Sequence, residues 1–207
     1  YNRALSEAEV AALYELESKP PFDFSESLFM HLKFDGDLSD SSGNSRNGNF
    51  VKDGSFVSNM YGIENTALKF NGSTVIELRE INLEYATVMA WIKNDAQTEE
   101  NFFSGQRVDS RHAIRFENNF LYESNDFQLP NNKWAHVAVT FSISGNTEEY
   151  LNGQLVSTYN SPVRKSLSGD YVLGYDYGFG SYFSGEVDNF RIYNRALSKE
   201  EVMALYE

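Results

Sequence analysis

Apolar and polar residues alternate with a period of two along most of this chain, which predicts β-strands rather than helices. The first alternating segment is 28–34, where Leu28, Met30, Leu32 and Phe34 share one face. We expect the polar loop that follows to be compact, because its Asp, Ser, Asn and Gly residues favour tight turns. Further strands are predicted at 66–70, 74–78, 87–93, 171–174 and 183–193.

Two hairpins and one central strand complete the predicted β-structure. The segment 134–141 (WAHVAVTF) is apolar on both faces, as expected of a central strand in a sandwich. Asn152-Gly153 separates two short apolar segments, which is the strongest short-range signal for a two-residue hairpin. A second hairpin is predicted over 113–122, with its turn at 117–119.

Helical spacing is confined to the two ends of the chain, which carry nearly the same sequence. Residues 1–15 read YNRALSEAEVAALYE and residues 193–207 read YNRALSKEEVMALYE, so twelve of fifteen positions are identical. In each copy a serine is followed three residues later by a glutamate, the pattern of a capping box, and a leucine and a valine flank the cap as a hydrophobic staple. The capping pairs are Ser6 with Glu9, and Ser198 with Glu201.

Self-similarity at so long a spacing indicates tandem domains rather than a solenoid of short repeats. We therefore interpret residues 1–24 as the C-terminal helix of a preceding repeat plus a linker, and residues 25–207 as one domain. About 180 residues are enough to build a full hydrophobic core. The first helix is expected to pack on this domain, to pack on a neighbouring molecule, or to fray.

The composition of the chain limits the classes of binding partner that we expect. The formal net charge of −13 opposes binding to nucleic acid or to an anionic membrane surface, because both need basic patches, and it favours cations such as calcium. Cysteine is absent, which excludes disulfide bonds and thiolate chemistry. No apolar segment approaches the roughly 20 residues of a membrane-spanning helix, so membrane insertion is not expected.

Several motifs together resemble the bacterial laminin-G-like (concanavalin A-like lectin/glucanase) domains. The resemblance covers 28–207 and implies an all-β fold: a two-sheet antiparallel jelly-roll sandwich with short terminal α-helices. This sandwich hosts lectins, carbohydrate-binding modules, glycoside hydrolases and adhesion domains, so the fold alone does not decide function. The motifs are LKFDGDLSDSSGNSRNG from Leu32, ALKFNG from Ala67, TVMAWIK from Thr87, NKWAHVAVTF from Asn132, YLNGQLV from Tyr150 and GEVDNFRIYNRALSKEEVMALY from Gly185.

A calcium site is the first candidate for chemistry. Hard oxygen ligands gather within ten residues at Asp35, Asp37, Asp40 and Asn44. Related jelly rolls hold a structural calcium where the first strand meets the last, and this resemblance implies Asp35 and Asp188 as side-chain ligands. Asp40 and Asn44 belong to the loop that would complete the shell. The alternative is that Asp40 and Asn44 only cap turns and that Asp188 accepts backbone amides.

A sugar site is the second candidate, because sugars need exposed aromatic faces and planar hydrogen-bonding groups. The loop 174–184 supplies both between flexible glycines, at Tyr175, Asp176, Tyr177, Phe179 and Tyr182. Further contacts are predicted at Arg107, Arg111, His112, Arg115 and Tyr122, whose arginines would suit an acidic or sulfated polysaccharide. In the alternative reading, Phe179 and Phe183 fold into the core and the tyrosines cover sandwich edges.

Enzyme activity is not expected. A retaining glycosidase needs two carboxylates about 5 to 5.5 Å apart, and in the hydrolases of this fold they alternate along one strand. Glu186 and Asp188 alternate, but no third acid follows. His31 and His136 are expected to be hydrogen-bonded core histidines, and Trp91 and Trp134 to be core residues.

The sequence therefore predicts a non-catalytic, calcium-stabilised carbohydrate-binding (lectin-like) module of a secreted or cell-surface multidomain protein. Its predicted partners are a polysaccharide or glycan and the neighbouring repeats of the same chain, with no nucleic acid. A structural spacer or protein-binding adhesion domain without a glycan site is the alternative, and a glycoside hydrolase is a more remote one.

Overall fold

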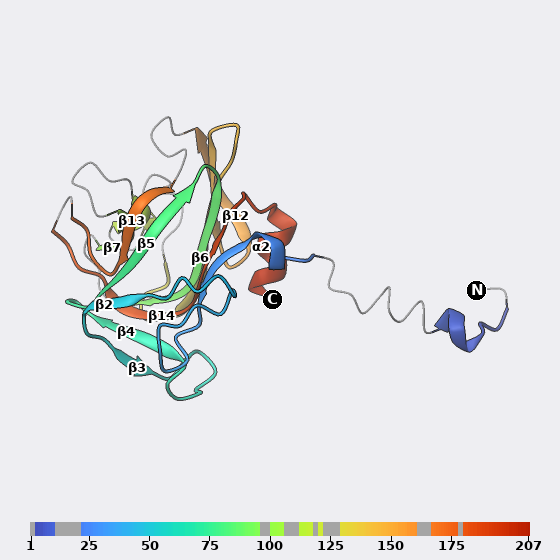
Figure 1. Cartoon of the computed structure of the whole chain (residues 1–207), viewed down its shortest axis with the longest axis horizontal. Coiled ribbons are helices and arrows are strands. Elements are labelled where there is room, and N and C mark those ends of the chain that lie inside the picture. The colour runs from blue at the N-terminus through green and yellow to red at the C-terminus, as the bar shows by residue number, and fades with distance from the viewer. Residues whose placement is uncertain are drawn as a thin grey trace.

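The alternating segments pair into two antiparallel β-sheets that pack face to face, as Figure 1 shows for the computed structural model. The structure describes residues 3–10, 22–95, 100–105, 112–117, 120–121, 129–160, 167–177 and 180–207. The predicted all-β sandwich is confirmed. A short 3-10 helix, η1 (Ser25–Ser27), leads into the first strand.

The larger sheet has the order β12-β11-β10-β6-β14-β4-β3, and β1 pairs with β14 beside β4. Every pairing is antiparallel. Because β1 pairs with β14, the first and last strands of the domain are neighbours. The strands are β1 (Leu28–Leu32), β3 (Ser55–Val57), β4 (Ala67–Asn71), β6 (Ala86–Asn94), β10 (Trp134–Phe141), β11 (Asn146–Leu151), β12 (Gln154–Asn160) and β14 (Ser184–Tyr193).

The smaller sheet has the order β2-β5-β13-β7-β8-β9. Its edge strand β2 is exposed at every position, whereas β5 and β13 turn apolar side chains toward the larger sheet. The strands are β2 (Asn49–Lys52), β5 (Val75–Leu83), β7 (Glu100–Gly105), β8 (His112–Glu117), β9 (Phe120–Leu121) and β13 (Leu167–Leu173).

A cluster of aromatic rings fills the space between the sheets. Phe70, Phe102 and Phe183 contact one another with ring centroids 5.3 to 5.9 Å apart, and Phe103 and Phe190 continue the cluster. All five rings are fully buried. Burial of one such side chain stabilises the fold by about 1.5–3 kcal/mol, so these strands are held mainly by apolar packing.

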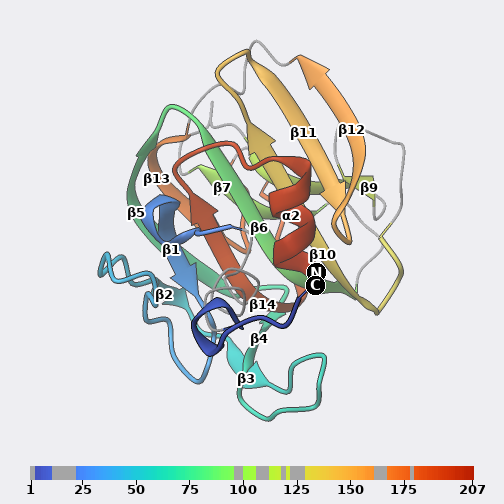
Figure 2. The ribbon, with the colours of Figure 1, turned by 90° about the vertical axis from the view of Figure 1, so that its right-hand side faces the viewer.

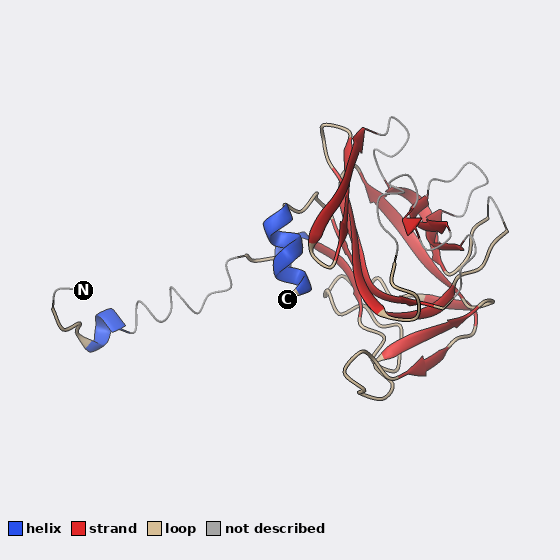
Figure 3. Ribbon diagram, turned by 180° about the vertical axis from the view of Figure 1, so that it is seen from behind, coloured by secondary structure: helices blue, strands red, loops and turns tan. Residues whose placement is uncertain are grey.

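A second apolar layer covers the outer face of the larger sheet. The helix α2 (Lys199–Tyr206) lies on this face, as seen in Figure 2 and from behind in Figure 3. Tyr206 stacks on Trp91 at 5.6 Å, and Val202 is buried in the same layer. Trp91 and His136 are register partners on this outer face. Trp91 is half-buried between this face and the helix, and Trp134 is half-buried as well, so the expectation that both are core residues is wrong.

Both predicted capping boxes are present. Ser198 and Glu201 exchange hydrogen bonds at the start of α2, and Arg195 binds the Glu201 carboxylate through both terminal nitrogens at 2.6 and 2.7 Å. Ser6 and Glu9 make the same exchange before the helical residues 7–10. Val10 is 53% exposed, and among the described residues no hydrogen bond or ring contact joins 3–10 to the sandwich. No described helix has the length and apolar content needed to cross a membrane.

Candidate functional site

The polar loop after β1 is folded around the carboxylate of Asp40. Its two oxygens accept hydrogen bonds from the amides of His31, Ser42 and Arg46 at 2.9 Å each, and from the Ser42 hydroxyl at 2.8 Å. Burial alone would raise the pKa of Asp40, but these hydrogen bonds outweigh it and lower the pKa below its usual range. The loop is thus compact, as predicted.

Asn44 ties the same loop to the first strand. Its side-chain amide donates to the carbonyl oxygens of Leu28 at 2.9 Å and Phe29 at 3.1 Å. Asp40 therefore caps the turn at Ser42, whereas Asn44 ties the loop to β1 instead of capping a turn.

Asp188 lies near Asp35, where β14 runs beside β1. The Asp188 side chain is buried, and Asn189, at a bulge with φ 53°, donates to its carboxylate at 2.9 Å. Burial raises the pKa of Asp188 to about 6, and the negative charge of Asp35 adds to the rise, whereas Arg191 and the Asn189 hydrogen bonds oppose it. Across the described ranges, no three His, Cys, Asp or Glu side chains form a group suited to a metal ion.

The two histidines of the larger sheet are buried and differ in their partners. His31 Nε2 lies 2.9 Å from Asn189 Oδ1 and 3.2 Å from Arg191 Nε, as expected of a hydrogen-bonded histidine. His136 lies beneath α2, and its Nδ1 has no hydrogen-bond partner among the described residues, so the expectation of full hydrogen bonding is wrong there. Burial lowers the pKa of His31 to about 4 and of His136 to about 3, with Arg191 adding to both shifts.

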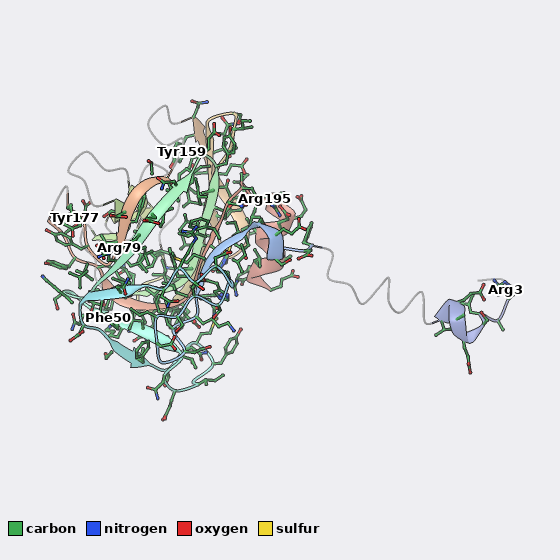
Figure 4. The ribbon with its side chains drawn as sticks, viewed as in Figure 1. Arg3, Phe50, Arg79, Tyr159, Tyr177 and Arg195 are labelled. Atoms are coloured by element: carbon green, nitrogen blue, oxygen red, sulfur yellow. The ribbon has the colours of Figure 1, made fainter. Side chains whose placement is uncertain are left out.

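The loop between β13 and β14 carries three tyrosines, with Tyr175 in contact with the other two, which we call the tyrosine platform: Tyr175, Tyr177 and Tyr182. The ring of Tyr175 lies 4.9 Å from that of Tyr177 and 4.5 Å from that of Tyr182. Tyr177 is 40% exposed, and Figure 4 shows it at the surface. The platform therefore presents aromatic area to solvent.

Backbone hydrogen bonds hold this loop as a narrow β-ladder. Tyr175 and Tyr182 form a bridge, the Asp176 amide donates to Ser181 O at 2.9 Å, and the Ser104 hydroxyl donates to Tyr175 O at 2.7 Å. The Asp176 side chain is fully buried. The prediction that Asp176 contacts a ligand at the surface is wrong, because the closed ladder turns that side chain inward.

Lys52 is a member of this site that sequence reasoning missed. Its ammonium donates to the Tyr182 hydroxyl at 2.6 Å and lies 4.7 Å from the ring centroid. Lys52 ends the edge strand β2, 130 residues away in sequence. Only the pairing of β2 with β5 brings it there, and no local signal could have shown this.

The other predicted sugar contacts are not tested by the structure. Phe183 is buried, as the alternative reading proposed for it. His112 and Arg115 lie on β8, where only the backbone is described. Four predicted residues fall outside the described residues: Arg107, Arg111, Tyr122 and Phe179.

The two alternating acids of β14 have different surroundings. Glu186 is paired with Lys93 at 3.0 Å, while Asp188 is buried beside the bulge. Neither side chain faces the tyrosine platform, because both share the outer face of the larger sheet with Trp91 and Lys93.

Comparison with known families decides the classification. The model of the concanavalin A-like lectin/glucanases superfamily, which carries the laminin G label, matches residues 69–203, well over half of the chain. The chain belongs to this superfamily. Its members share the jelly-roll sandwich described above, and the match includes the segment that forms the tyrosine platform. A comparison with curated proteins found no match.

Solved structures share the fold of this concanavalin A-like domain. Domain 4 of AbnA, a GH43 extracellular arabinanase from Geobacillus stearothermophilus solved with arabinotriose, has a TM-score of 0.73 and 22% identity, covering 87% of this chain and 98% of that chain. The botulinum neurotoxin serotype D ligand-binding domain, solved with N-acetylneuraminic acid, has a TM-score of 0.67 and 19% identity, covering 88% of this chain and 51% of that chain. The type C toxin structure, described as dependent on two ganglioside molecules for cell entry, has a TM-score of 0.70, 17% identity and coverages of 88% and 51%.

Proposed function

We propose that this protein is a non-catalytic carbohydrate-binding module that holds its glycan on the tyrosine platform. The observation that carries this proposal is the contact of Tyr175 with Tyr177 and Tyr182 at the surface, where Tyr177 is 40% exposed. Aromatic faces pack against the C–H side of a sugar ring, and phenol hydroxyls bond its oxygens. The hydrogen-bonded ladder fixes these groups before a ligand arrives, which lowers the entropy cost of binding.

The relatives support a glycan as the ligand. Domains of the same fold were solved with arabinotriose and with N-acetylneuraminic acid. The acids of β14 support a non-catalytic role, because Glu186 is bound to Lys93 and Asp188 is buried. A module of this kind suits a secreted or cell-surface multidomain protein, and one of the similar domains comes from an extracellular enzyme.

A glycan array followed by calorimetry with the best ligand tests this proposal. Tyr177→Ala is expected to weaken binding at least ~30-fold, because truncating a central aromatic contact costs about 2 kcal/mol or more. Tyr61→Ala is the matched control, since Tyr61 is 76% exposed and lies on a different loop, between β3 and β4. The control should bind as the wild type does.

Three outcomes would contradict the proposed function. Failure to bind any glycan, or equal binding by the Tyr177→Ala variant, would favour a spacer or adhesion domain instead. Release of reducing sugar from a polysaccharide would show a hydrolase.

We also propose that calcium stabilises the junction of β1 and β14, with Asp35 and Asp188 as the side-chain ligands. The donor chemistry fits, because calcium prefers carboxylate and carbonyl oxygens. The raised pKa of Asp188 beside the charge of Asp35 indicates an electrostatic cost that a bound cation would relieve. The role would be structural, since the ion would join the first and last strands.

Thermal unfolding with calcium and with EDTA tests this site. Saturating calcium is expected to add about 2.7 kcal/mol at a hundredfold excess over the dissociation constant, and Asp188→Asn should abolish the gain. Asp53→Asn is the control, because Asp53 is exposed on the turn between β2 and β3. An equal melting temperature in calcium and EDTA would argue against the site.

A further inference from the structure

A polar pocket of about 170 Å³ opens between the Asp40 loop and strand β5. We call it the arginine pocket, because Arg46 of the loop and Arg79 of β5 both line it. Its lining residues are Met30, Ser45, Arg46, Asn47, Arg79 and Glu80. It shares no residue with the tyrosine platform or with the proposed calcium ligands.

The first wall of the arginine pocket is the loop around Asp40. The Arg46 amide donates to the Asp40 carboxylate, and Asn47 accepts from the Asp40 amide, both at 2.9 Å. The Arg46 guanidinium stacks on the Phe29 ring at 4.0 Å from its centroid. Arg46 Nε is buried and has no hydrogen-bond partner among the described residues. The hydrogen bonds and the Phe29 contact fix this wall in place. A buried donor without an acceptor is costly, so a ligand that brings an acceptor would be favoured here.

The second wall is a bulge in β5. Arg79 and Glu80 stand opposite the single residue Asp170 of β13, whose carboxylate accepts from the Glu80 amide at 2.9 Å. Glu80 adopts φ 55°, a conformation that costs free energy for a residue other than glycine. Arg79 donates through Nε to Glu77 at 2.6 Å, which holds the side chain while its terminal nitrogens remain as donors.

The charges of the pocket select among ligands. Guanidinium groups bind carboxylates with two parallel hydrogen bonds, and Arg46 and Arg79 offer such donors from both walls. The Glu80 carboxylate would repel a bare anion but would accept hydrogen bonds from hydroxyl groups. Met30 adds an apolar surface for C–H groups. A ligand that suits Arg46, Arg79, Glu80 and Met30 combines a carboxylate with neighbouring hydroxyl groups on a small saturated ring.

We propose that the arginine pocket binds a single uronic acid unit. The carboxylate lies between Arg46 and Arg79, and the ring hydroxyls donate to Glu80. The pocket is smaller than the roughly 300–1,000 Å³ of sites for drug-sized ligands, which suits one sugar ring. This inference extends the proposed function to a second site with its own ligand class.

The two sites are separate positions along the same sheet edge. Lys52, which contacts the tyrosine platform, is the register partner of Val75 on β5. Arg79 lies four residues further along β5, which corresponds to about 13 Å. Figure 4 labels Arg79 and Tyr177 on the same side of the molecule. Either site can therefore be altered without touching the other.

Titration of the protein with D-glucuronic acid, followed by NMR chemical shifts, tests the pocket. D-glucose is the neutral ligand of equal ring size and is expected to bind about tenfold more weakly or worse, the equivalent of one lost charged hydrogen bond. Arg79→Gln should weaken glucuronic acid by a similar factor. Lys33→Gln is the matched control, because Lys33 is an exposed cation just after β1 that does not line the pocket.

Glu80→Gln tests whether Glu80 accepts hydrogen bonds from the hydroxyl groups of the sugar. Because the substitution relieves repulsion of any anion, inorganic sulfate serves as the reference: if Glu80 accepts hydroxyl groups, the variant should strengthen sulfate more than glucuronic acid. An equal gain for both anions, equal binding of inorganic sulfate by the wild type, or an equal loss in the Lys33→Gln control would each overturn the proposal. Tyr177→Ala should leave this binding unchanged, so failure of the tyrosine platform as a glycan site is distinguished from failure of the pocket.

Discussion

Replacement of Gly174 by alanine is expected to lower the free energy of unfolding by about 4 kcal/mol. Gly174 has φ +87°, a left-handed conformation that costs a residue with a side chain about 1–2 kcal/mol. A Cβ atom there would also overlap the Thr74 carbonyl oxygen and approach the Phe70 ring to 2.6 Å. Because the obstacles are backbone and a buried ring, the strain cannot be relieved by a simple side-chain rotation.

Urea or thermal denaturation measures this loss, and Gly180→Ala is its matched control. Gly180 lies in the same loop with φ +70°, but a Cβ atom there would meet nothing within 4 Å. The control should cost only about 1 kcal/mol, from the backbone conformation alone. Equal stabilities of the two variants would show that Gly174 is not tightly enclosed.

Thr87→Val is expected to lower the free energy of unfolding by about 3 kcal/mol. The buried hydroxyl of Thr87 donates to Arg195 O and accepts from the Leu197 amide, both at 2.9 Å. Valine has nearly the same shape, so packing is kept while the two backbone groups of the segment before α2 lose their partner. Each buried group left without a hydrogen bond costs about 1–3 kcal/mol.

The same substitution at Thr158 provides the comparison, because Thr158 is exposed on the edge strand β12. Thr158→Val should change stability by less than about 0.5 kcal/mol. If both valine variants unfold at the same denaturant concentration, the Thr87 hydroxyl does not anchor the segment between β14 and α2 to β6.

Strands with strong local signals were predictable from the sequence. The predicted segment 134–141 coincides with β10, since burial on both faces leaves a continuous apolar run. The predicted hairpin at Asn152-Gly153 is confirmed, with φ 48° and 74° at the two turn residues, as a type I′ turn requires. The C-terminal helix is confirmed as well, because its capping box is a local motif.

Three strands escaped prediction because distant partners determine them. β2 is exposed at every position and has no alternation to read, and β3 has only three residues, none of them buried. β2 exists because it pairs with β5, 23 to 28 positions further along the chain, and β3 because it pairs with β4, 10 to 14 positions further along. β7 contributes Phe102 and Phe103 to the core, but the two adjacent aromatics break the alternation.

The candidate sites also divide into residues that the local sequence indicates and contacts that only the folded chain creates. The tyrosines of the platform could be named from their loop, but the contact of Tyr182 with Lys52 depends on strand order. Asp176 was misplaced because sequence does not show which way a loop residue turns. The arginine pocket had no signal at all, since Arg46 and Arg79 meet only after a loop and a bulge from different parts of the chain come together.

The pairing of β1 with β14 also sets how the domain would respond to a pulling force. Leu28 at the start of β1 is paired with Tyr193 at the end of β14, and Phe24 lies 5.9 Å from the Tyr193 ring. Tension applied through the chain on both sides would therefore act at one end of this strand pair. Hydrogen bonds would then break in succession rather than together, after α2 had left the sheet. The domain should extend under low force, with α2 yielding before the sandwich.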